Sequence, residues 1–181
     1  VVPKSVDPSA YKITFAPGLL TVPESLHGGL VVAGPRAGSK TEELTIPEGL
    51  GPDIAGLSTK VTFVESLPPF APMALAGGGA FIKWREAIET TDAVILHLEG
   101  GAPAAVRQGQ MIYIAGWPDD AGWRRILEML AEQAGLDLLN LPPDLRLRET
   151  DSHRFWFNYG PRAVTYQELT LPAAGVHWEA K

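Results

Sequence analysis

The chain has 181 residues, of which 45% are hydrophobic and 20% charged, enough apolar material for one core and a second, smaller one. A net charge of −6 without a basic block argues against nucleic acid as a partner, and no apolar run is long enough for a membrane-spanning helix. The absence of cysteine excludes disulfides, thiolate metal ligands and cysteine nucleophiles, and it fits a reducing, cytoplasmic location.

The first two predicted strands are residues 11–16 and 30–33. The second is a continuous apolar run, Leu-Val-Val-Ala, which is typical of a strand buried in a parallel sheet. Parallel neighbours need a crossover of a dozen or more residues, usually a helix. Only the segment 20–29 lies between these runs, and it carries one proline and two glycines. The crossover is therefore abnormally short, or residues are missing from it.

Short apolar runs bounded by turn residues predict four further strands, at residues 60–65, 81–86, 93–98 and 110–115. The run 60–65 alternates between apolar and polar residues, which predicts one buried and one wet face. Residues 34–52 and 67–79, rich in glycine and proline, are predicted loops, and a Gly/Pro turn precedes residue 110.

Residues 109–135 combine the last of these strands with a predicted amphipathic helix. From residue 121 the apolar side chains recur every three or four positions: Trp123, Ile126, Leu127, Leu130 and Ala134. Asp119 and Asp120 suit the helix start, because carboxylates accept hydrogen bonds from free N–H groups there, and Gly135 suits its end. A buried strand that feeds a helix is the basic unit of an α/β fold.

The composition changes after Pro142-Pro143. Four short strands without a helix are predicted beyond this point, at residues 145–148, 154–159, 163–168 and 176–179. The sequence therefore predicts an α/β open-sheet domain over residues 1–142 and a small antiparallel β domain over residues 143–181.

No catalytic or cofactor-binding constellation emerges from the motifs. The loop 34–41 lacks the glycine that a phosphate loop needs before its Lys-Thr pair, because Ser39 stands there, and Pro47 precedes any helix. The carboxylates show no pair at the ends of barrel strands, as a glycosidase would need. The four histidines are far apart in sequence, so a metal site would need a chance tertiary arrangement. No cofactor and no metal are predicted.

A resemblance to a known family changes this interpretation. Residues 30–50, LVVAGPRAGSKTEELTIPEGL, and the strand from residue 60 resemble the middle domain of glycoside hydrolase family 42 β-galactosidases, with its GPR-x-G-SKTE loop. Supporting matches follow in the family's order, at residues 81–86, 101–104, 109–119 and 154–159. The resemblance covers nearly the whole chain, and the SKTE loop is its specific part.

The resemblance implies a role in assembly. Family members are retaining hydrolases of terminal β-D-galactosides, usually homotrimers, with a catalytic (β/α)8 barrel, a flavodoxin-like trimerisation domain related to class I glutamine amidotransferases, and a small β domain. Residues 1–142 would be most of the trimerisation domain, incomplete at its N-terminus, and residues 143–181 the last domain. The implied partners are the protein's own barrel and the other subunits. The barrel and its two catalytic glutamates are absent from this sequence, so a fragment is expected and no residue here inherits their roles.

Two alternatives remain open at this point. If any residues border a neighbouring sugar site, Arg36, Lys40 and Glu42 are the candidates, although salt bridges and loop hydrogen bonds are the simpler role for such charges. The chain would otherwise be a stand-alone scaffold or carbohydrate-binding protein that uses Trp117 or Trp156. An amidotransferase activity is excluded by the lack of cysteine.

Overall fold

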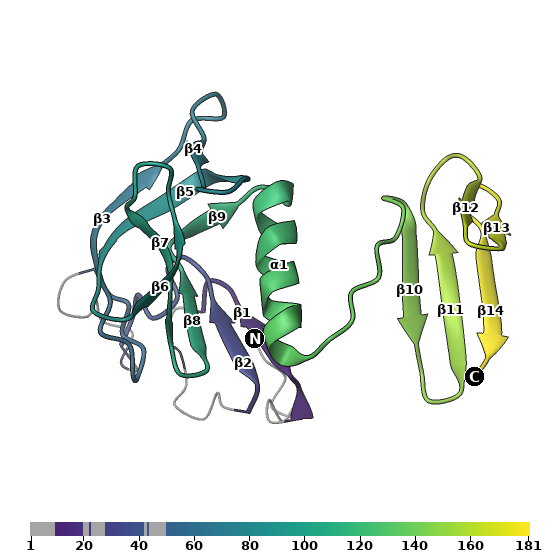
Figure 1. Cartoon of the computed structure of the whole chain (residues 1–181), viewed down its shortest axis with the longest axis horizontal. Helices are drawn as coiled ribbons and strands as arrows, with labels where there is room; N and C mark the ends of the chain where they lie inside the picture. Colours follow the sequence, from purple (N-terminus) through teal and green to yellow (C-terminus); the bar gives the residue numbers. More distant parts are fainter. Residues whose placement is uncertain (1–9, 20–21, 23–27, 42, 44–49) are drawn as a thin grey trace. The chain divides into compact units, whose positions relative to one another are not determined.

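The computed structural model describes residues 10–19, 22, 28–41, 43 and 50–181 (Figure 1). The chain divides into two compact units, Val1–Asp137 and Leu138–Lys181, each with its own hydrophobic core. The sequence suggests a domain boundary at residue 142. In the structure, Leu141 already packs against the core of the second unit. The described residues contain one helix, α1 (Asp120–Ala134), and it belongs to the first unit. The rest of the regular structure in both units consists of small mixed or antiparallel sheets.

The described part of the first unit consists, in chain order, of β1 Ile13–Ala16, β2 Leu30–Ala33, β3 Lys60–Ser66, β4 Met73–Ala74, β5 Ala80–Glu89, β6 Ala93–His97, β7 Pro103–Gln108, β8 Met111–Ile114, β9 Gly116–Pro118 and α1 Asp120–Ala134. The second unit consists of β10 Leu145–Glu149, β11 His153–Asn158, β12 Val164–Tyr166, β13 Leu169–Leu171 and β14 Val176–Ala180. Among the residues that the structure describes, no helix has the length and apolar character needed to span a bilayer.

The central sheet of the first unit has the strand order β1-β2-β8-β7-β6. Its first three strands are parallel, and all four residues of β2 are buried, so the prediction of a buried parallel strand at residues 30–33 is confirmed. The strands β7 and β6 extend the sheet in antiparallel fashion, which makes it mixed. Most of the predicted crossover, residues 20–29, lies outside the described residues.

The side chains of this sheet lie in two core clusters, one on each face. Along β8, Ile112 and Ile114 share one core cluster with Ile126 of α1, whereas Tyr113 lies in the cluster on the opposite face, as the alternation of strand side chains requires. That opposite cluster includes Val61 of β3. Strand β3 belongs to a second sheet, in which β5 pairs with β3, β4 and β9. Strand β5 contributes Ile88 to this cluster and Phe81 to the cluster that contains Ile126, so the second sheet takes part in both cores.

The helix α1 begins and ends where the sequence predicts. Asp119 is the N-cap, and its side chain accepts a hydrogen bond from the Gly122 N–H at 2.7 Å. Gly135 ends the helix in the left-handed conformation, with φ of 58°. The apolar face is narrower than the periodicity suggests, because Leu127 is 39% exposed while Ile126 is buried.

Replacing Asp119 with alanine is expected to lower the free energy of unfolding by about 2 kcal/mol. The Asp119 carboxylate also accepts from the Ala80 N–H at 3.1 Å, so its loss frees one donor at the helix start and one at the start of β5. Urea unfolding monitored by circular dichroism measures the change. Asp119→Asn keeps the accepting oxygen and Asp120→Ala touches no cap, so each should cost only a few tenths of a kcal/mol. An equal loss in Asp120→Ala would contradict this explanation.

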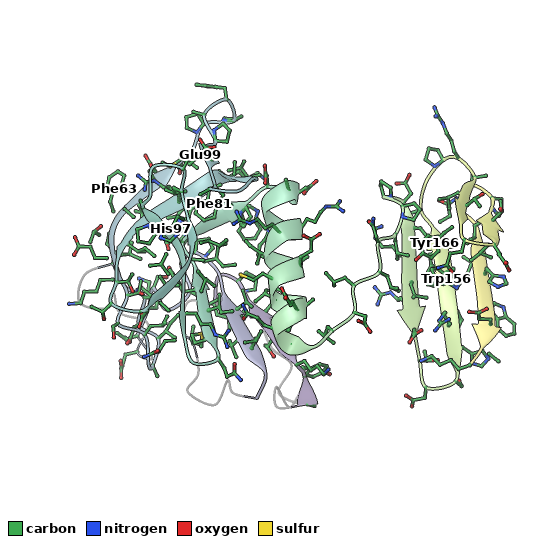
Figure 2. All side chains as sticks on the ribbon, in the orientation of Figure 1. Phe63, Phe81, His97, Glu99, Trp156 and Tyr166 are labelled. Atoms are coloured by element: carbon green, nitrogen blue, oxygen red, sulfur yellow. The ribbon has the colours of Figure 1, made fainter. Side chains whose placement is uncertain are left out.

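The strand β3 corrects one prediction. The sequence suggests clean alternation over residues 60–65, but Phe63 is 53% exposed although it lies two residues after the buried Val61. The pairing of β3 with β5 shifts register between these two residues, so a bulge at Thr62 turns Phe63 to the solvent side. Figure 2 shows Phe63 at the periphery of the unit, in contrast with the buried Phe81.

Several strands form where the sequence predicts turns or a single element. The residues of β7 begin in the predicted Gly/Pro turn, and β9 occupies the predicted break after residue 115. Proline and alanine are weak strand formers, so pairing with both β6 and β8 decides the conformation of β7. The run predicted as one strand at residues 163–168 is the start of a hairpin, β12–β13, whose turn begins at Gln167 with φ of 53°.

The second unit consists of short antiparallel strands without a helix. Its three-stranded sheet has the order β10-β11-β14. Trp156 and Leu145 form its core with Leu171 of the hairpin, and the Trp156 ring lies 5.7 Å from the Tyr166 ring (Figure 2). Phe155 and Phe157 are stacked along β11, with ring centroids 6.4 Å apart.

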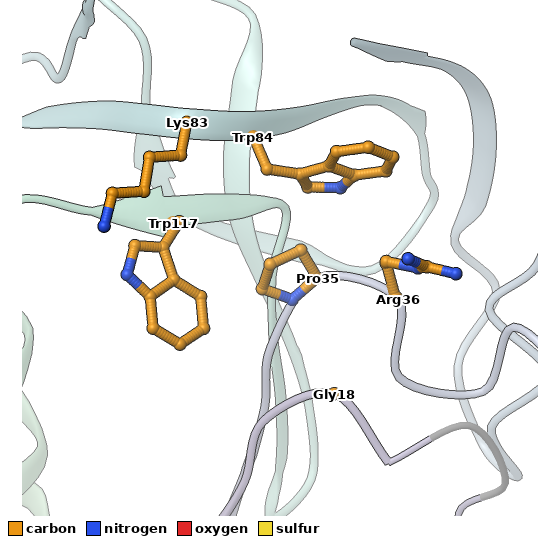
Figure 3. Close-up of a pocket in the computed structure, with 6 residues that line it drawn as sticks. All are labelled: Gly18, Pro35, Arg36, Lys83, Trp84 and Trp117. Atoms are coloured by element: carbon orange, nitrogen blue, oxygen red, sulfur yellow. The ribbon is translucent and has the colours of Figure 1, made fainter. Parts of the chain in front are cut away.

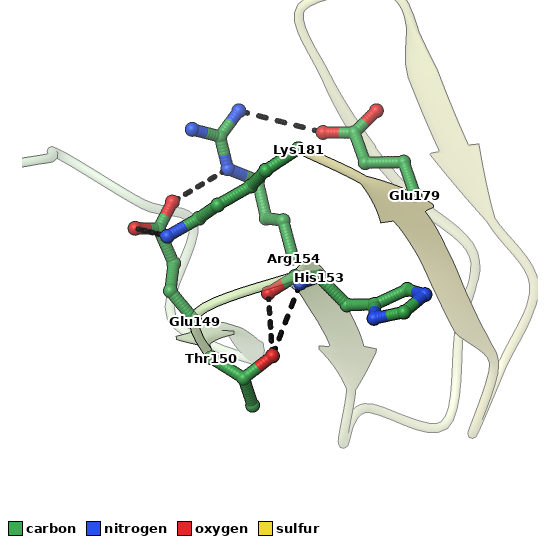
Figure 4. Close-up of polar contacts among 6 residues, drawn as sticks. All are labelled: Glu149, Thr150, His153, Arg154, Glu179 and Lys181. Carbon is green, nitrogen blue, oxygen red and sulfur yellow. Dashed lines mark hydrogen bonds and ion pairs between the residues drawn. The ribbon is translucent and has the colours of Figure 1, made fainter.

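Exposed charges connect the ends of this sheet's strands (Figure 4). Arg154 lies 2.6 Å from Glu149 and 3.4 Å from Glu179, and Lys181 lies 3.0 Å from Glu149. The hydrogen bond from Arg154 is the main cause that lowers the pKa of Glu149, followed by the hydrogen bond from Lys181. Solvent reaches all four groups, so the network aligns β10, β11 and β14 without amounting to a large source of stability.

Candidate binding pocket

The loop that follows β2 is held as a compact turn. The Ala37 N–H donates to the Gly34 carbonyl at 3.1 Å, and the Gly38 N–H donates to the Leu19 carbonyl at 2.9 Å. Gly38 has φ of 64°, and its carbonyl accepts from the Asp53 N–H at 2.7 Å. The described residues of this loop form turns rather than the start of a helix, so it does not have the geometry of a phosphate loop.

A buried carboxylate fastens this loop to the second sheet. Glu86 on β5 is only 4% exposed, and one of its oxygens accepts from the Arg36 N–H at 2.9 Å and from Trp84 Nε1 at 3.2 Å. Its other oxygen accepts from the Tyr113 hydroxyl. Three donors from β5, β8 and the loop therefore compensate for burial of the charge.

The same contact perturbs the tyrosine. Burial raises the pKa of Tyr113 well above its ordinary value of 10, and the negative charge of Glu86 and its hydrogen bond raise this pKa further. The hydroxyl is therefore a fixed donor to Glu86 under physiological conditions.

A cavity of about 600 Å³ lies beside this carboxylate (Figure 3). Its described lining consists of Gly18, Pro35, Arg36, Lys83, Trp84 and Trp117. Three of these residues follow the carboxyl ends of the parallel strands: Gly18 follows β1, while Pro35 and Arg36 follow β2. Ligands of open sheets with parallel strands bind at that edge. The volume is within the range of small-molecule sites.

Of the three site residues that the sequence suggests, the structure places Arg36 at the cavity. Arg36 lines the cavity, and its guanidinium lies 5.6 Å from the centre of the Trp84 ring. Lys40 is half-buried and is not among the described lining residues. Glu42 lies outside the described residues.

The sequence suggests two of the lining residues, Arg36 and, as a possible carbohydrate contact, Trp117, but it assigns no role to the others. Lys83, Trp84 and Trp117 come from β5 and β9, far from the loop in sequence, and only folding brings them to Arg36. One available signal was Glu86, an acidic residue two positions after Trp84 and hence on the same face of the strand.

The other candidates from the sequence are placed differently. Trp156 is 8% exposed and packs in the core of the second unit, where a cavity of about 410 Å³ also contacts it. Within the described residues no group of three His, Asp or Glu side chains is close enough to hold a metal ion.

Comparison with known proteins identifies the family. The family model of the β-galactosidase trimerisation domain matches residues 1–137. The chain therefore belongs to this family, which is part of the glycoside hydrolase family 42 β-galactosidases.

Individual relatives agree with this assignment. A β-galactosidase of Thermus thermophilus is 41% identical over 175 residues, which cover 91% of this chain and 27% of that protein. The crystal structure of a β-galactosidase from the psychrophilic Marinomonas ef1 matches 96% of this chain and 30% of its own, with a TM-score of 0.86 and 30% identity. A β-galactosidase from the Antarctic haloarchaeon Halorubrum lacusprofundi has the same fold, with a TM-score of 0.82 and 23% identity, over 99% of this chain and 33% of its own. The chain thus spans about a third or less of the length of these relatives.

Proposed function

We propose that this chain is the non-catalytic C-terminal portion of a retaining β-galactosidase, an enzyme that hydrolyses terminal β-D-galactosides, and that it assembles the homotrimer. The match of residues 1–137 to the β-galactosidase trimerisation domain carries this proposal. The relatives are about three times longer, which supports a catalytic barrel in the parent protein outside this sequence.

The finer features belong to the same proposal. The parallel strands β1, β2 and β8, followed by α1, support a flavodoxin-like, amidotransferase-like origin for residues 1–142. Residues 143–181 serve as the C-terminal β domain. The partners are the parent's barrel and two further subunits, the substrate of the parent is a galactoside, and the location is the cytoplasm, which the lack of cysteine supports.

The loop after β2 has a proposed role at the subunit boundary. Arg36 and Lys40 in this loop, together with Glu42, border either an interface or the sugar site of a neighbouring subunit. The attachment of Arg36 to the buried Glu86 supports this role, because it holds the loop in one conformation.

Sedimentation equilibrium of the purified chain tests assembly directly. A species of three times 19.4 kDa is expected, without turnover of a nitrophenyl β-galactoside. A monomer at every concentration, or turnover that survives repurification, contradicts the proposal. The reading frame upstream of Val1 gives a second test: it should encode a (β/α)8 barrel with glutamates at two strand ends.

A stand-alone scaffold or carbohydrate-binding protein is the second candidate. The observation in its favour is the cavity beside Trp84 and the 38% exposed Trp117, since indole rings are common contacts for ligands. An upstream frame that encodes a start codon or an unrelated domain would favour this candidate.

A further inference from the structure

The second unit has a cavity of its own, with a volume of about 410 Å³. Its sheet supplies Arg154 and Trp156 from β11 and His177 and Glu179 from β14, and the hairpin β12–β13 supplies residues 166–169. The register of β11 with β14 puts the four sheet residues on the same face. The cavity therefore lies where the hairpin turn meets one face of the sheet, and its volume is within the range of small-molecule sites.

One wall of this cavity is aromatic and fixed. Trp156 is 8% exposed and belongs to the core of the unit with Leu145 and Leu171. The Tyr166 ring lies 5.7 Å from the Trp156 ring, at an interplanar angle of 40°. The indole cannot turn without disrupting this core, so its position is set before a ligand arrives. Such a wall suits the C–H face of a saturated ring.

The polar side chains of the lining all end in planar groups. These groups are a guanidinium, an imidazole, a carboxamide and two carboxylates, from Arg154, His177, Gln167, Glu168 and Glu179. Guanidinium and carboxylate groups each offer two parallel hydrogen-bonding positions, so one such group can hold two neighbouring hydroxyls. The set contains both donors and acceptors, which suits a ligand made of hydroxyl groups because each hydroxyl both donates and accepts.

The charges of this unit are balanced. Residues 138–181, all of which the structure describes, contain as many acidic as basic side chains. Arg154 lies 2.6 Å from Glu149 and 3.4 Å from Glu179, so its charge is compensated within the sheet and its guanidinium is held in place (Figure 4). The lining has two carboxylates besides this guanidinium, which disfavours an anionic ligand, and a cationic ligand would compete with Arg154 for Glu179. The lining therefore favours a neutral ligand rich in hydroxyl groups.

The hairpin turn places a strained residue at the cavity. Gln167 has φ of 53°, in the left-handed region that favours glycine. It belongs to a two-residue turn between Tyr166 and Leu169, which pair with each other, and such turns usually carry glycine, asparagine or aspartate where φ is positive. Strained residues gather at ligand sites. The glutamine at this position gives the cavity a carboxamide where glycine would leave the turn relaxed.

We propose that this cavity binds a neutral pyranose sugar. The ring lies against Trp156 and Tyr166, and its hydroxyls form hydrogen bonds with Gln167, His177 and Glu179. The site is separate from the assembly role proposed above, because all its lining residues lie beyond residues 1–137, which match the trimerisation domain. The chain can therefore form trimers whether or not the sugar binds.

Nuclear magnetic resonance of the ¹⁵N-labelled full chain at pH 7 tests the ligand class. Galactose and glucose are the neutral probes, galacturonate the anionic one, and galactosamine, mostly protonated at this pH, the cationic one. At least one neutral sugar is expected to shift the Trp156 indole signal with a Kd of about 1 mM, and both charged sugars to bind about tenfold more weakly. Equal or tighter binding of a charged sugar, or no response to either neutral sugar, would overturn the proposal.

The indole signals also report where a sugar binds. The chain has five tryptophans, and Trp156 is the one that lines this cavity, whereas Trp84 and Trp117 line the cavity of the first unit. Shifts confined to the signals of Trp84 and Trp117 would place the sugar in the other cavity and would overturn the assignment.

Two variants separate binding from folding. Gln167→Gly removes the carboxamide and accepts the positive φ, so the melting temperature should stay the same or rise, while sugar binding weakens about tenfold. His177→Ala, at an exposed strand position, should weaken binding by a similar factor. Ala174→Gly is the matched control, because Ala174 has φ of 50° in the same unit but does not line the cavity.

The outcomes for these variants are distinct from those for assembly. Unchanged sugar binding in both Gln167→Gly and His177→Ala, or equal weakening in Ala174→Gly, would overturn the assignment of the site. Sedimentation equilibrium of the same variants should match that of the wild type, so a failure of trimer assembly and a failure of sugar binding are told apart.

Discussion

Replacing Glu86, the buried carboxylate beside the cavity, with alanine is expected to lower the free energy of unfolding by about 3 to 5 kcal/mol. The substitution leaves three donors without their acceptor: the Arg36 N–H, Trp84 Nε1 and the Tyr113 hydroxyl. Tyr113 is 1% exposed, so its hydroxyl cannot turn to bulk water. Differential scanning calorimetry should show a fall in melting temperature of about 10 °C.

The matched variant is Glu86→Gln, which keeps the size of the side chain and one carbonyl oxygen. The amide can accept from the loop and from Trp84 and donate to the tyrosine oxygen, so less than half of the destabilisation is expected. Equal losses for alanine and glutamine would show that the negative charge matters more than hydrogen bonding. A loss of less than about 1 kcal/mol in Glu86→Ala would contradict the role assigned to this carboxylate.

The alkaline limb of the stability curve gives an independent check of the same contact. The folded-state pKa of Tyr113 is raised well above 10, so the unfolded chain releases this proton first as the pH rises. The stabilisation is therefore complete below about pH 10 and is lost above it, by up to about 1.4 kcal/mol per pH unit. Tyr113→Phe should flatten this limb relative to the wild type.

Gly79→Ala is expected to cost more than about 3 kcal/mol. Gly79 has φ of 79°, and a Cβ added there would lie 2.4 Å from the Gly122 nitrogen and 2.5 Å from its Cα. Both atoms belong to the backbone of the first turn of α1, which Asp119 caps. The substitution would therefore force the helix start away from the β4–β5 turn, besides straining the residue itself.

Two neighbouring glycines provide graded controls for this effect. Gly78 also has a positive φ, 109°, but a Cβ there would meet nothing within 4 Å, so Gly78→Ala should cost only about 1 to 2 kcal/mol. Gly100 has neither constraint, and Gly100→Ala should be neutral within about 0.5 kcal/mol. Urea unfolding of the three variants should give this order, and equal costs at Gly78 and Gly79 would exclude the backbone contact as the cause.

The sequence alone predicts those elements whose conformation is decided by residues within the element itself. The helix α1 was predictable because Asp119, the apolar period and Gly135 all act within one element. Strand β2 was predictable because a short apolar run with two valines, bounded by glycines, is typical of a strand buried on both faces. The family resemblance was likewise carried by contiguous residues around Arg36, and the family match over residues 1–137 confirms it.

The remaining features depend on partners that are distant in sequence. Nothing near Pro103 indicates a strand, and β7 exists because β6 and β8 pair with it from both sides. The exposure of Phe63 follows from a bulge that only the register with β5 reveals. The pocket combines a loop after β2 with Lys83 and Trp117 from other strands, so no linear motif could have identified it.

The parallel pairing of β2 with β8 also limits how this protein can be made. Val32 pairs with Ile112, so β1 and β2 leave the ribosome long before their neighbour has been synthesised. Until β8 emerges, the edge of β2 offers its N–H and C=O groups to any passing strand. Pairing of such distant segments is slow, because a long loop must close before any contact compensates for the lost entropy. During synthesis, therefore, this edge of β2 stays open to wrong pairing until residues 111–114 have emerged.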